Sequence, residues 1–175
     1  MKTILVSLSL VFILFSCESG NHVDFSKNVE TVKELVNLHA LEEADAISAM
    51  FHEDLEWQGP AYGSDPLNKA DHMTAIVMYH DMFENLKYTA NNWLPGVNAE
   101  TGQLDGSVRT YGVWSGNHSP TGTPLELTSY HTFDFKDGKI IAGGDYFDLG
   151  GMFASFEVAP ETEQTDEVVQ RISNT

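Results

Sequence analysis

Residues 128–151, TSYHTFDFKDGKIIAGGDYFDLGG, decide the fold of this chain, because they are typical of two β-strands joined by one tight turn. Aromatic and β-branched residues fill 130–135 and 140–147, and Asp137-Gly138 between them is a strong hairpin signal. The second strand ends in two carboxylates, Asp145 and Asp148. A carboxylate near the end of an apolar strand is either solvated or projects into a cavity, where burial raises its pKa toward that of a useful base.

The turn leaves the register of this hairpin open. A two-residue turn places Tyr130 opposite Asp145, whereas a bulged three-residue loop over 136–138 places Ser129 there, with His131 as the diagonal neighbour. We favour the bulged register because it puts Asp145 and His131 on one mostly apolar face. The other members of that face are Phe133, Phe135, Ile141 and Gly143.

The first sixteen residues have the pattern of a secretion signal. Lys2 supplies a positive charge, and 4–15 is an apolar run too short to span a bilayer. The run ends at Leu14-Phe15-Ser16-Cys17, which resembles the lipobox of bacterial lipoproteins, where the cysteine becomes the lipidated first residue. We therefore expect removal of residues 1–16, acylation of Cys17, and an exported protein that is lipid-anchored to a membrane of a bacterial cell envelope. The alternative is an ordinary secretion signal that leaves a free thiol.

The rest of the chain reads as one domain with two short extensions. Residues 17–24 are expected to form a polar tether, 25–156 the domain and 157–175 an acidic tail. The formal net charge is −17 at pH 7. Such a surface repels nucleic-acid phosphates, so we expect no nucleic-acid partner, and membrane contact is expected through acyl chains on Cys17.

Hydrophobic periodicity predicts helices in the first half of the domain and strands in the second. The expected helices cover 25–41, 45–51 and about 64–86. The last of these is predicted to be capped at Ser64-Asp65-Pro66, with an apolar face made by Met73, Ile76, Val77, His80 and Phe83. Strands are expected at 54–58, 88–94 and 108–115 and in the hairpin. This order favours an α+β domain in which helices cover one side of a curved antiparallel sheet.

The order of these segments resembles the SnoaL-like group of the nuclear transport factor 2-like superfamily. The motifs that carry the resemblance are WQGPAYG at 57–63, GVWSGNHSPTG at 112–122, FDFKDGKI at 133–140 and DYFDLGGMF at 145–153. The resemblance covers about residues 25–156 and implies a cone-shaped curved sheet wrapped around helices, with an apolar cavity. It further implies a small hydrophobic molecule as ligand, no cofactor, and a homodimer.

Within this superfamily, the DYFD motif is similar to the end of limonene epoxide hydrolase, and Asp145 matches the aspartate that activates water in that enzyme. The Arg-x-Asp and Tyr-x-Asn pairs of such enzymes correspond to Arg109-Thr110-Tyr111 and Trp57-Gln58-Gly59, so the usual acid is missing. Epoxide opening needs an acid as well as a base. We therefore expect proton-transfer chemistry of the isomerase, cyclase or hydrolase type with Asp145 as acid or base. The alternative is a non-catalytic module that binds a small ligand.

Two sets of site residues follow. The expected catalytic residues are Asp145 and its partner His131. The expected ligand-binding residues are Trp57, His80, Tyr111, Trp114, Tyr130 and Phe133. Aromatic residues on a half-buried sheet are also common as core or subunit contacts, and a histidine on an apolar helix face is commonly a bonded core residue.

Two further expectations concern metal binding and the second carboxylate. His72 and His80 are eight residues apart and do not share a helix face in the manner of a zinc motif, so no metal site is expected. If burial dominates, Asp145 titrates above its ordinary pKa. Asp148 is expected to cap or anchor the end of the strand.

Overall fold

The computed structural model describes residues 20–157. The predicted signal segment, the predicted lipidation at Cys17 and all but the first residue of the predicted tail lie outside the described residues. Within that range the chain forms four helices and six strands. In chain order they are α1 (Phe25–Ala40), α2 (Ala44–Met50), β1 (Phe51–Gln58), α3 (Lys69–Met82), β2 (Phe83–Ala90), β3 (Leu94–Val97), β4 (Leu104–His118), β5 (Pro124–Lys136), β6 (Lys139–Tyr146) and α4 (Leu149–Glu157).

The strands form one curved, unclosed sheet. Neighbouring strands follow the order β1-β6-β5-β4-β2, and β3 pairs with β4. The pairings are antiparallel except that of β1 with β6, which is parallel. The predicted α+β class is confirmed, and β1 lies at one edge of the sheet. The sheet is mixed and not purely antiparallel, because β1, which lies between α2 and α3 in the chain, runs parallel to β6.

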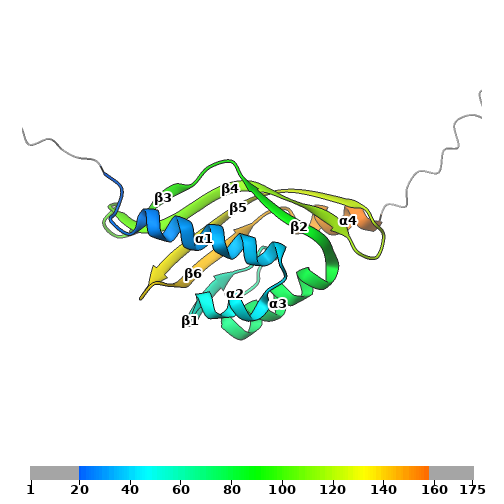
Figure 1. The fold of residues 1–175 in the computed structure, drawn as a ribbon, viewed down its shortest axis with the longest axis horizontal. Helices are drawn as coiled ribbons and strands as arrows, with labels where there is room; N and C mark the ends of the chain where they lie inside the picture. The colour runs from blue at the N-terminus through cyan, green and yellow to red at the C-terminus, as the bar shows by residue number, and fades with distance from the viewer. Residues whose placement is uncertain (1–19, 158–175) are drawn as a thin grey trace, which may run out of the picture.

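Helices α1, α2 and α3 lie beneath the arch of the sheet, and α4 lies near one end of it (Figure 1). The main core fills the space between these helices and the sheet. Its buried members are Phe25, Val29, Val32, Leu35, Ile47, Phe51, Leu55, Trp57, Ile76, Val108, Phe133 and Ile140. A second, smaller cluster joins Met152 of α4 to Phe83, Leu86 and Leu125. Apolar side chains therefore fill much of the space between sheet and helices in two clusters.

Helix α3 begins later than the sequence predicted. The side chain of Asn68 accepts a hydrogen bond from the backbone N–H of Asp71, so Asn68 is the N-cap. The preceding Leu67 exchanges two backbone hydrogen bonds with Trp57 of β1, which holds this segment extended. The predicted cap at 64–66 is wrong because the pairing with β1 takes up the chain that would have formed the first turn.

The buried face of α3 also differs from the predicted one. His72 and Ile76 are 5% and 3% exposed, whereas Val77 is 43% exposed. Tyr79 is partly buried on the same side as Ile76. The inward face therefore follows positions 72, 76 and 79, which have helical spacing and bring a histidine and a tyrosine toward the sheet.

The hairpin turn has two residues. Lys136 pairs with Lys139, and the turn residues Asp137 and Gly138 have φ values of 53° and 77°. Positive φ at both positions is the requirement of a type I′ turn, which Asp-Gly satisfies. The predicted three-residue loop is therefore wrong.

A bulge beyond the turn then shifts the register. Ile140 pairs with Phe135 and Ala142 with Asp134, so Ile141 is left without a partner. As a result His131 pairs directly with Asp145. Neither predicted register is correct, although the prediction that these two residues share a face is. Ile140, fully buried, occupies the core position that had been expected for Ile141.

The end of β6 leads directly into α4, which the sequence had not predicted. The carboxylate of Asp148 accepts a hydrogen bond of 2.8 Å from the backbone N–H of Gly151. Asp148 therefore caps the first turn of α4, whereas the sequence had suggested a cap or anchor at the end of the strand.

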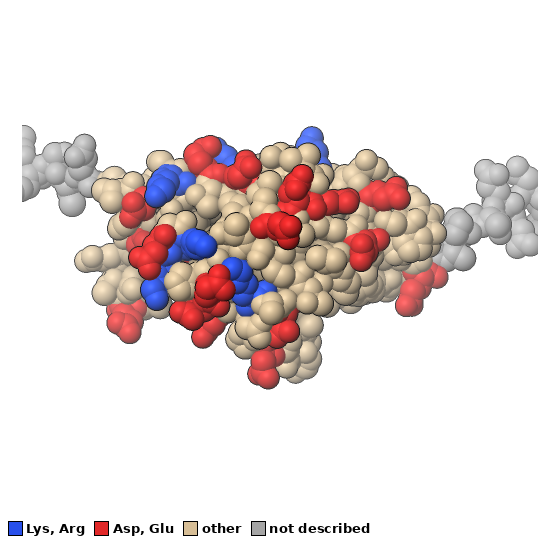
Figure 2. Space-filling model, turned by 60° about the horizontal axis from the view of Figure 1, so that its bottom comes forward, with Lys and Arg blue, Asp and Glu red and all other residues tan. Residues whose placement is uncertain are grey.

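Acidic side chains are scattered over the face in Figure 2, with the fewer Lys and Arg side chains interspersed among them. That face carries no extended basic patch. Among residues 20–157, no helix combines the length and the apolar character that crossing a membrane requires.

Candidate functional site

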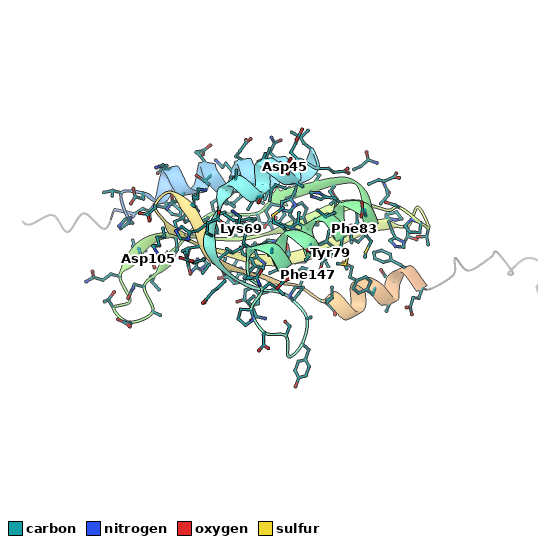
Figure 3. The ribbon with its side chains drawn as sticks, turned by 90° about the horizontal axis from the view of Figure 1, so that it is seen from below. Asp45, Lys69, Tyr79, Phe83, Asp105 and Phe147 are labelled. Atoms are coloured by element: carbon teal, nitrogen blue, oxygen red, sulfur yellow. The ribbon has the colours of Figure 1, made fainter. Side chains whose placement is uncertain are left out.

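A cavity of about 130 Å³ lies between the sheet and the helices. Most of its wall is aliphatic or aromatic, and Tyr79, Phe83 and Phe147 of this wall can be followed in Figure 3. Among residues 20–157, Asp145 is the one acidic side chain in the wall, and no Lys or Arg of this range belongs to it. The other wall side chains with polar atoms are His39, Trp57, His72, Tyr79, Trp114 and His131.

Asp145 is held by donors from two neighbouring strands. Its Oδ1 lies 2.7 Å from Nδ1 of His131 on β5, and its Oδ2 accepts a hydrogen bond of 2.8 Å from Nε1 of Trp57 on β1. The side chain of Asp145 is 19% exposed. Gly143 has no Cβ, and an added one would collide with the Trp57 ring and with the carbonyl of Thr132. Glycine at this position therefore allows Trp57 to lie close enough to bond the carboxylate.

The hydrogen bonds around His131 fix its protonation. Nε1 of Trp114 can only donate, and it lies 3.0 Å from Nε2 of His131, so that nitrogen carries no proton. The proton is therefore on Nδ1, which donates to Asp145. His131 is a neutral imidazole in this arrangement and Asp145 is a carboxylate.

Ser129, His131 and Asp145 form a hydrogen-bonded chain similar in form to a serine-hydrolase triad. The hydroxyl of Ser129 lies 2.8 Å from Nε2 of His131. Ser129 is only 3% exposed and does not contribute to the cavity wall. A nucleophile must reach the substrate, so Ser129 positions His131 and does not serve as an attacking group.

The pKa of Asp145 is lower than its ordinary value. Burial acts to raise this pKa, but the hydrogen bonds that the carboxylate accepts from His131 and Trp57 outweigh it. Donors that bond the charged form favour ionisation. Burial therefore does not dominate, and the raised pKa that was expected under that condition does not apply.

Two further histidines of the wall are held neutral by burial. Burial, together with neighbouring His80, lowers the pKa of His39 to about 3. Burial lowers the pKa of His72 to about 4, although nearby Asp145 acts in the opposite direction. Nδ1 of His39 lies 3.2 Å from Nε2 of His80. At neutral pH these rings therefore offer hydrogen bonds without carrying charge.

Tyr79 adds a hydroxyl group to the same wall. Burial, together with nearby Asp145, raises the pKa of Tyr79 to about 12. Its phenol is therefore protonated at neutral pH and available as a hydrogen-bond donor.

Five of the predicted site residues meet at the cavity. They are Asp145, His131, Trp57, Trp114 and Phe133. His80 is not a wall residue and is connected to the cavity only through His39.

Tyr111 and Tyr130, predicted to bind the ligand, are not brought to the cavity. They pair across β4 and β5, and their rings stack with centroids 4.6 Å apart. Tyr111 is 46% exposed. Since side chains alternate between the faces of a strand, their position next to Thr110 and His131, which point inward, places them on the outer face.

Arg109 is also kept away from the cavity. Its guanidinium donates to the backbone carbonyls of Val108 and Phe133 and lies 2.9 Å from a carboxylate oxygen of Asp134. This side chain therefore cannot orient an acid at the site, in line with the missing acid noted in the sequence.

Three wall residues were missed by the sequence analysis as parts of the site, namely His39, His72 and Tyr79. Helical spacing from Ile76 could have identified His72 and Tyr79, if the inward face of α3 had been placed one residue nearer the N-terminus than predicted. His39 gave no such signal, because only the packing of α1 against the sheet brings its last turn to the cavity. Within the described range, no three His, Cys, Asp or Glu side chains are grouped in a way that could hold a metal ion.

A substitution of Trp57 can remove its hydrogen bond to Asp145 while keeping an aromatic ring in the cavity wall. Trp57→Phe keeps an aromatic ring but removes the N–H that bonds Asp145. We expect the pKa of Asp145 to rise, because the carboxylate loses one of its two donors. A carboxyl ¹³C NMR titration measures it, with Trp93→Phe, which lies outside the cavity wall, as the matched control. An unchanged pKa in Trp57→Phe would show that this hydrogen bond does not govern the ionisation of Asp145.

Comparison with protein families identifies this arrangement. The family model of the SnoaL-like domain matches residues 32–143. The chain belongs to the SnoaL-like domain family. The matched range covers most of α1 and nearly all of the sheet, and ends two residues before Asp145. No curated protein matches the sequence of this SnoaL-like chain at a significant level.

Solved structures similar to this SnoaL-like chain share its fold at low sequence identity. A candidate SnoaL-like polyketide cyclase from Jannaschia sp. CCS1 is 15% identical with a TM-score of 0.67, and the match covers 81% of this chain and 99% of that one. The epoxide hydrolase/cyclase-like enzyme SalBIII, with a role in pyran ring formation in salinomycin, is 20% identical with a TM-score of 0.61, covering 73% and 95%. An LEH-like epoxide hydrolase of M. tuberculosis is 18% identical with a TM-score of 0.56, covering 74% and 89%.

Proposed function

We propose that this SnoaL-like domain binds a small hydrophobic molecule in the cavity and that Asp145 takes a proton from it as general base. The single observation that carries the proposal is a carboxylate that accepts hydrogen bonds from His131 and Trp57 in a mostly apolar wall. A general base has to be ionised and within reach of the proton that it removes. The lowered pKa of Asp145 supports the first condition, and its place in the cavity wall supports the second.

The lowered pKa restricts the chemistry that Asp145 performs. It keeps the carboxylate ionised at neutral pH, but it also makes Asp145 a weaker base. Such a base acts on protons that are already activated, such as those on a carbon next to a carbonyl group. The neutral donors in the wall, from His39, His72 and Tyr79, suit the negative charge that then develops on the carbonyl oxygen. This favours an isomerase or cyclase over an epoxide hydrolase, whose leaving oxygen requires a proton from an acid.

The experiment that tests this proposal does not require the natural substrate. The purified protein is incubated with cyclohexanone in D₂O, and loss of the α-proton signal is followed by ¹H NMR. We expect exchange faster than in buffer alone, because Asp145 removes the α-proton and returns a deuteron from solvent.

The alternative is a binding module that uses the same cavity without chemistry. It is favoured by the apolar character of most of the wall and by the many hydrogen bonds already made by His131. Saturable binding of cyclohexanone without any acceleration of exchange would select this alternative.

We also propose that the domain is tethered to a bacterial membrane through Cys17. Mass spectrometry of the membrane fraction is expected to show a mature chain that begins with a diacylglyceryl-modified Cys17, and Cys17→Ala is expected to release the domain in soluble form. A mature chain beginning at another residue would end this proposal. The expected homodimer and the expected lack of a nucleic-acid partner stay predictions.

A further inference from the structure

We propose that His72 donates a hydrogen bond to an oxygen atom of the bound molecule. This contact rests on the proposed ligand cavity and adds a positioning residue to it. His72 lies on α3, whereas the hydrogen-bonded Asp145 and His131 lie on strands β6 and β5.

His72 is enclosed but has no protein partner for its ring nitrogens. The residue is 5% exposed, and neither nitrogen makes a hydrogen bond within residues 20–157. A ring nitrogen completely sealed from solvent and without a hydrogen-bond partner would be an unsatisfied buried atom, and within residues 20–157 neither nitrogen of His72 is one. The ring nitrogens of His72 therefore reach open space, and the space that this residue lines is the cavity. Buried polar groups without a partner are costly, so a ligand that bonds His72 removes a cost.

Trp57 connects His72 to Asp145. The rings of Trp57 and His72 are stacked, with centroids 4.3 Å apart and an angle of 22° between their planes. The edge of the same indole bonds Asp145 through Nε1 at 2.8 Å. One side chain therefore fixes the donor and the base relative to each other, and both line the cavity in which a small molecule would bind.

His72 acts as a donor because it is neutral. Burial lowers its pKa to about 4, so at neutral pH the ring has one N–H and one bare nitrogen. Donation of a hydrogen bond from this N–H leaves the proton on His72. Its contribution is orientation of the oxygen and stabilisation of negative charge that develops there, and no proton is transferred.

The polar groups of the wall indicate which molecules fit. The N–H of His72 and the O–H of Tyr79 need an acceptor atom, which an alkylammonium ion lacks. A carboxylate would supply acceptors but would place a second negative charge beside Asp145, with no Lys or Arg in the wall to offset it. An uncharged molecule with a carbonyl or ether oxygen satisfies the donors without this penalty. An apolar protein cavity of about 150 Å³ holds benzene, so a single six-membered ring is a suitable size.

The test compares two probes of nearly the same shape, cyclohexanone and methylenecyclohexane. Their dissociation constants are measured by NMR titration on the wild-type protein, His72→Phe and His72→Gln. We expect the wild type to prefer the ketone by about fivefold, the effect of one neutral hydrogen bond. His72→Phe keeps a ring against Trp57 but has no N–H, and its preference is expected to vanish. His72→Gln restores an N–H and is expected to recover part of the ketone preference.

The matched control is His118→Phe. His118 also stacks on an aromatic ring, that of Phe156, with centroids 4.3 Å apart, but it lies outside the cavity wall.

Several outcomes would overturn the inference. They are an absence of ketone binding, an equal affinity of the wild type for both probes, a ketone preference that persists in folded His72→Phe, and tighter binding of cyclohexylammonium than of cyclohexanone. The ¹⁵N shifts of His72 in the wild type provide a measurement that needs no variant, and they must change on addition of the ketone but not of the alkene. None of these readouts involves turnover. If the protein shows a ketone preference that depends on His72 but does not accelerate α-proton exchange, the catalytic proposal is rejected and the inference on His72 stands.

Discussion

The Asp145→Asn protein is expected to lose its acceleration of α-proton exchange by about 10²- to 10⁴-fold, the range that a general base contributes. An amide has nearly the same shape as a carboxylate but cannot accept a proton at neutral pH. Exchange of cyclohexanone protons in D₂O measures the effect directly. The control is Asp148→Asn, which makes the same chemical change at an exposed residue outside the cavity wall. Asparagine caps helices as well as aspartate does, so α4 keeps its first turn.

The same substitution also changes stability, because both oxygens of Asp145 accept N–H groups. The single oxygen of an amide can satisfy either His131 or Trp57, and its NH₂ group then faces the other donor. His131 cannot relieve the conflict by moving its proton to Nε2, since that nitrogen already faces the N–H of Trp114. We expect a loss of about 1–3 kcal/mol in the free energy of unfolding, the cost of one unsatisfied buried donor.

Chemical denaturation therefore accompanies the exchange assay. A folded Asp145→Asn protein that keeps more than a tenth of the wild-type exchange rate would remove Asp145 from the role of base.

Elements whose signals are local were predictable from the sequence. The 3.6-residue periodicity of 25–41 gave α1 nearly to its ends, and Asp137-Gly138 gave the hairpin. The start of α3 was missed because Asn68 acts as the cap only when Leu67 is paired with Trp57, a contact between segments that the sequence does not connect. The bulge at Ile141 was missed for a similar reason: burial of Ile140 in the core determines it.

The site was predictable where it depends on strand alternation. Asp145 and His131 were expected on one face, and that face was correct even though the register was not. The same alternation excludes Tyr111 and Tyr130, which the sequence analysis had included because it treated aromatic residues near the hairpin alike. The direction of the Asp145 pKa shift could not be predicted, because it depends on whether hydrogen-bond donors reach the carboxylate. Trp57 does so from β1, which is far from Asp145 in sequence but pairs in parallel with β6.

Lowering the pH from 7.5 to 5 is expected to reduce the free energy of unfolding by about 4 kcal/mol, about 2 kcal/mol from each of two buried histidines. The pKa of His39 is about 3 and that of His72 about 4 in the folded protein, whereas an unfolded histidine titrates near 6.5. Below pH 6.5 the unfolded chain therefore binds protons that the folded chain does not, and stability falls as the pH falls. Asp145 does not contribute in this window, because its lowered pKa favours the folded state above the unfolded value and that contribution is lost only at more acidic pH.

Urea unfolding at the two pH values measures this loss. In His72→Phe one of the two titrating groups is absent, so the loss between pH 7.5 and pH 5 is expected to fall to about 2 kcal/mol. In His118→Phe it is expected to stay at about 4 kcal/mol, because both buried histidines remain. An unchanged loss in folded His72→Phe would mean that His72 accepts a proton in the folded state. The ring would then be a cation beside Asp145 near pH 5, and the neutral donor proposed for the ligand oxygen would not exist at that pH.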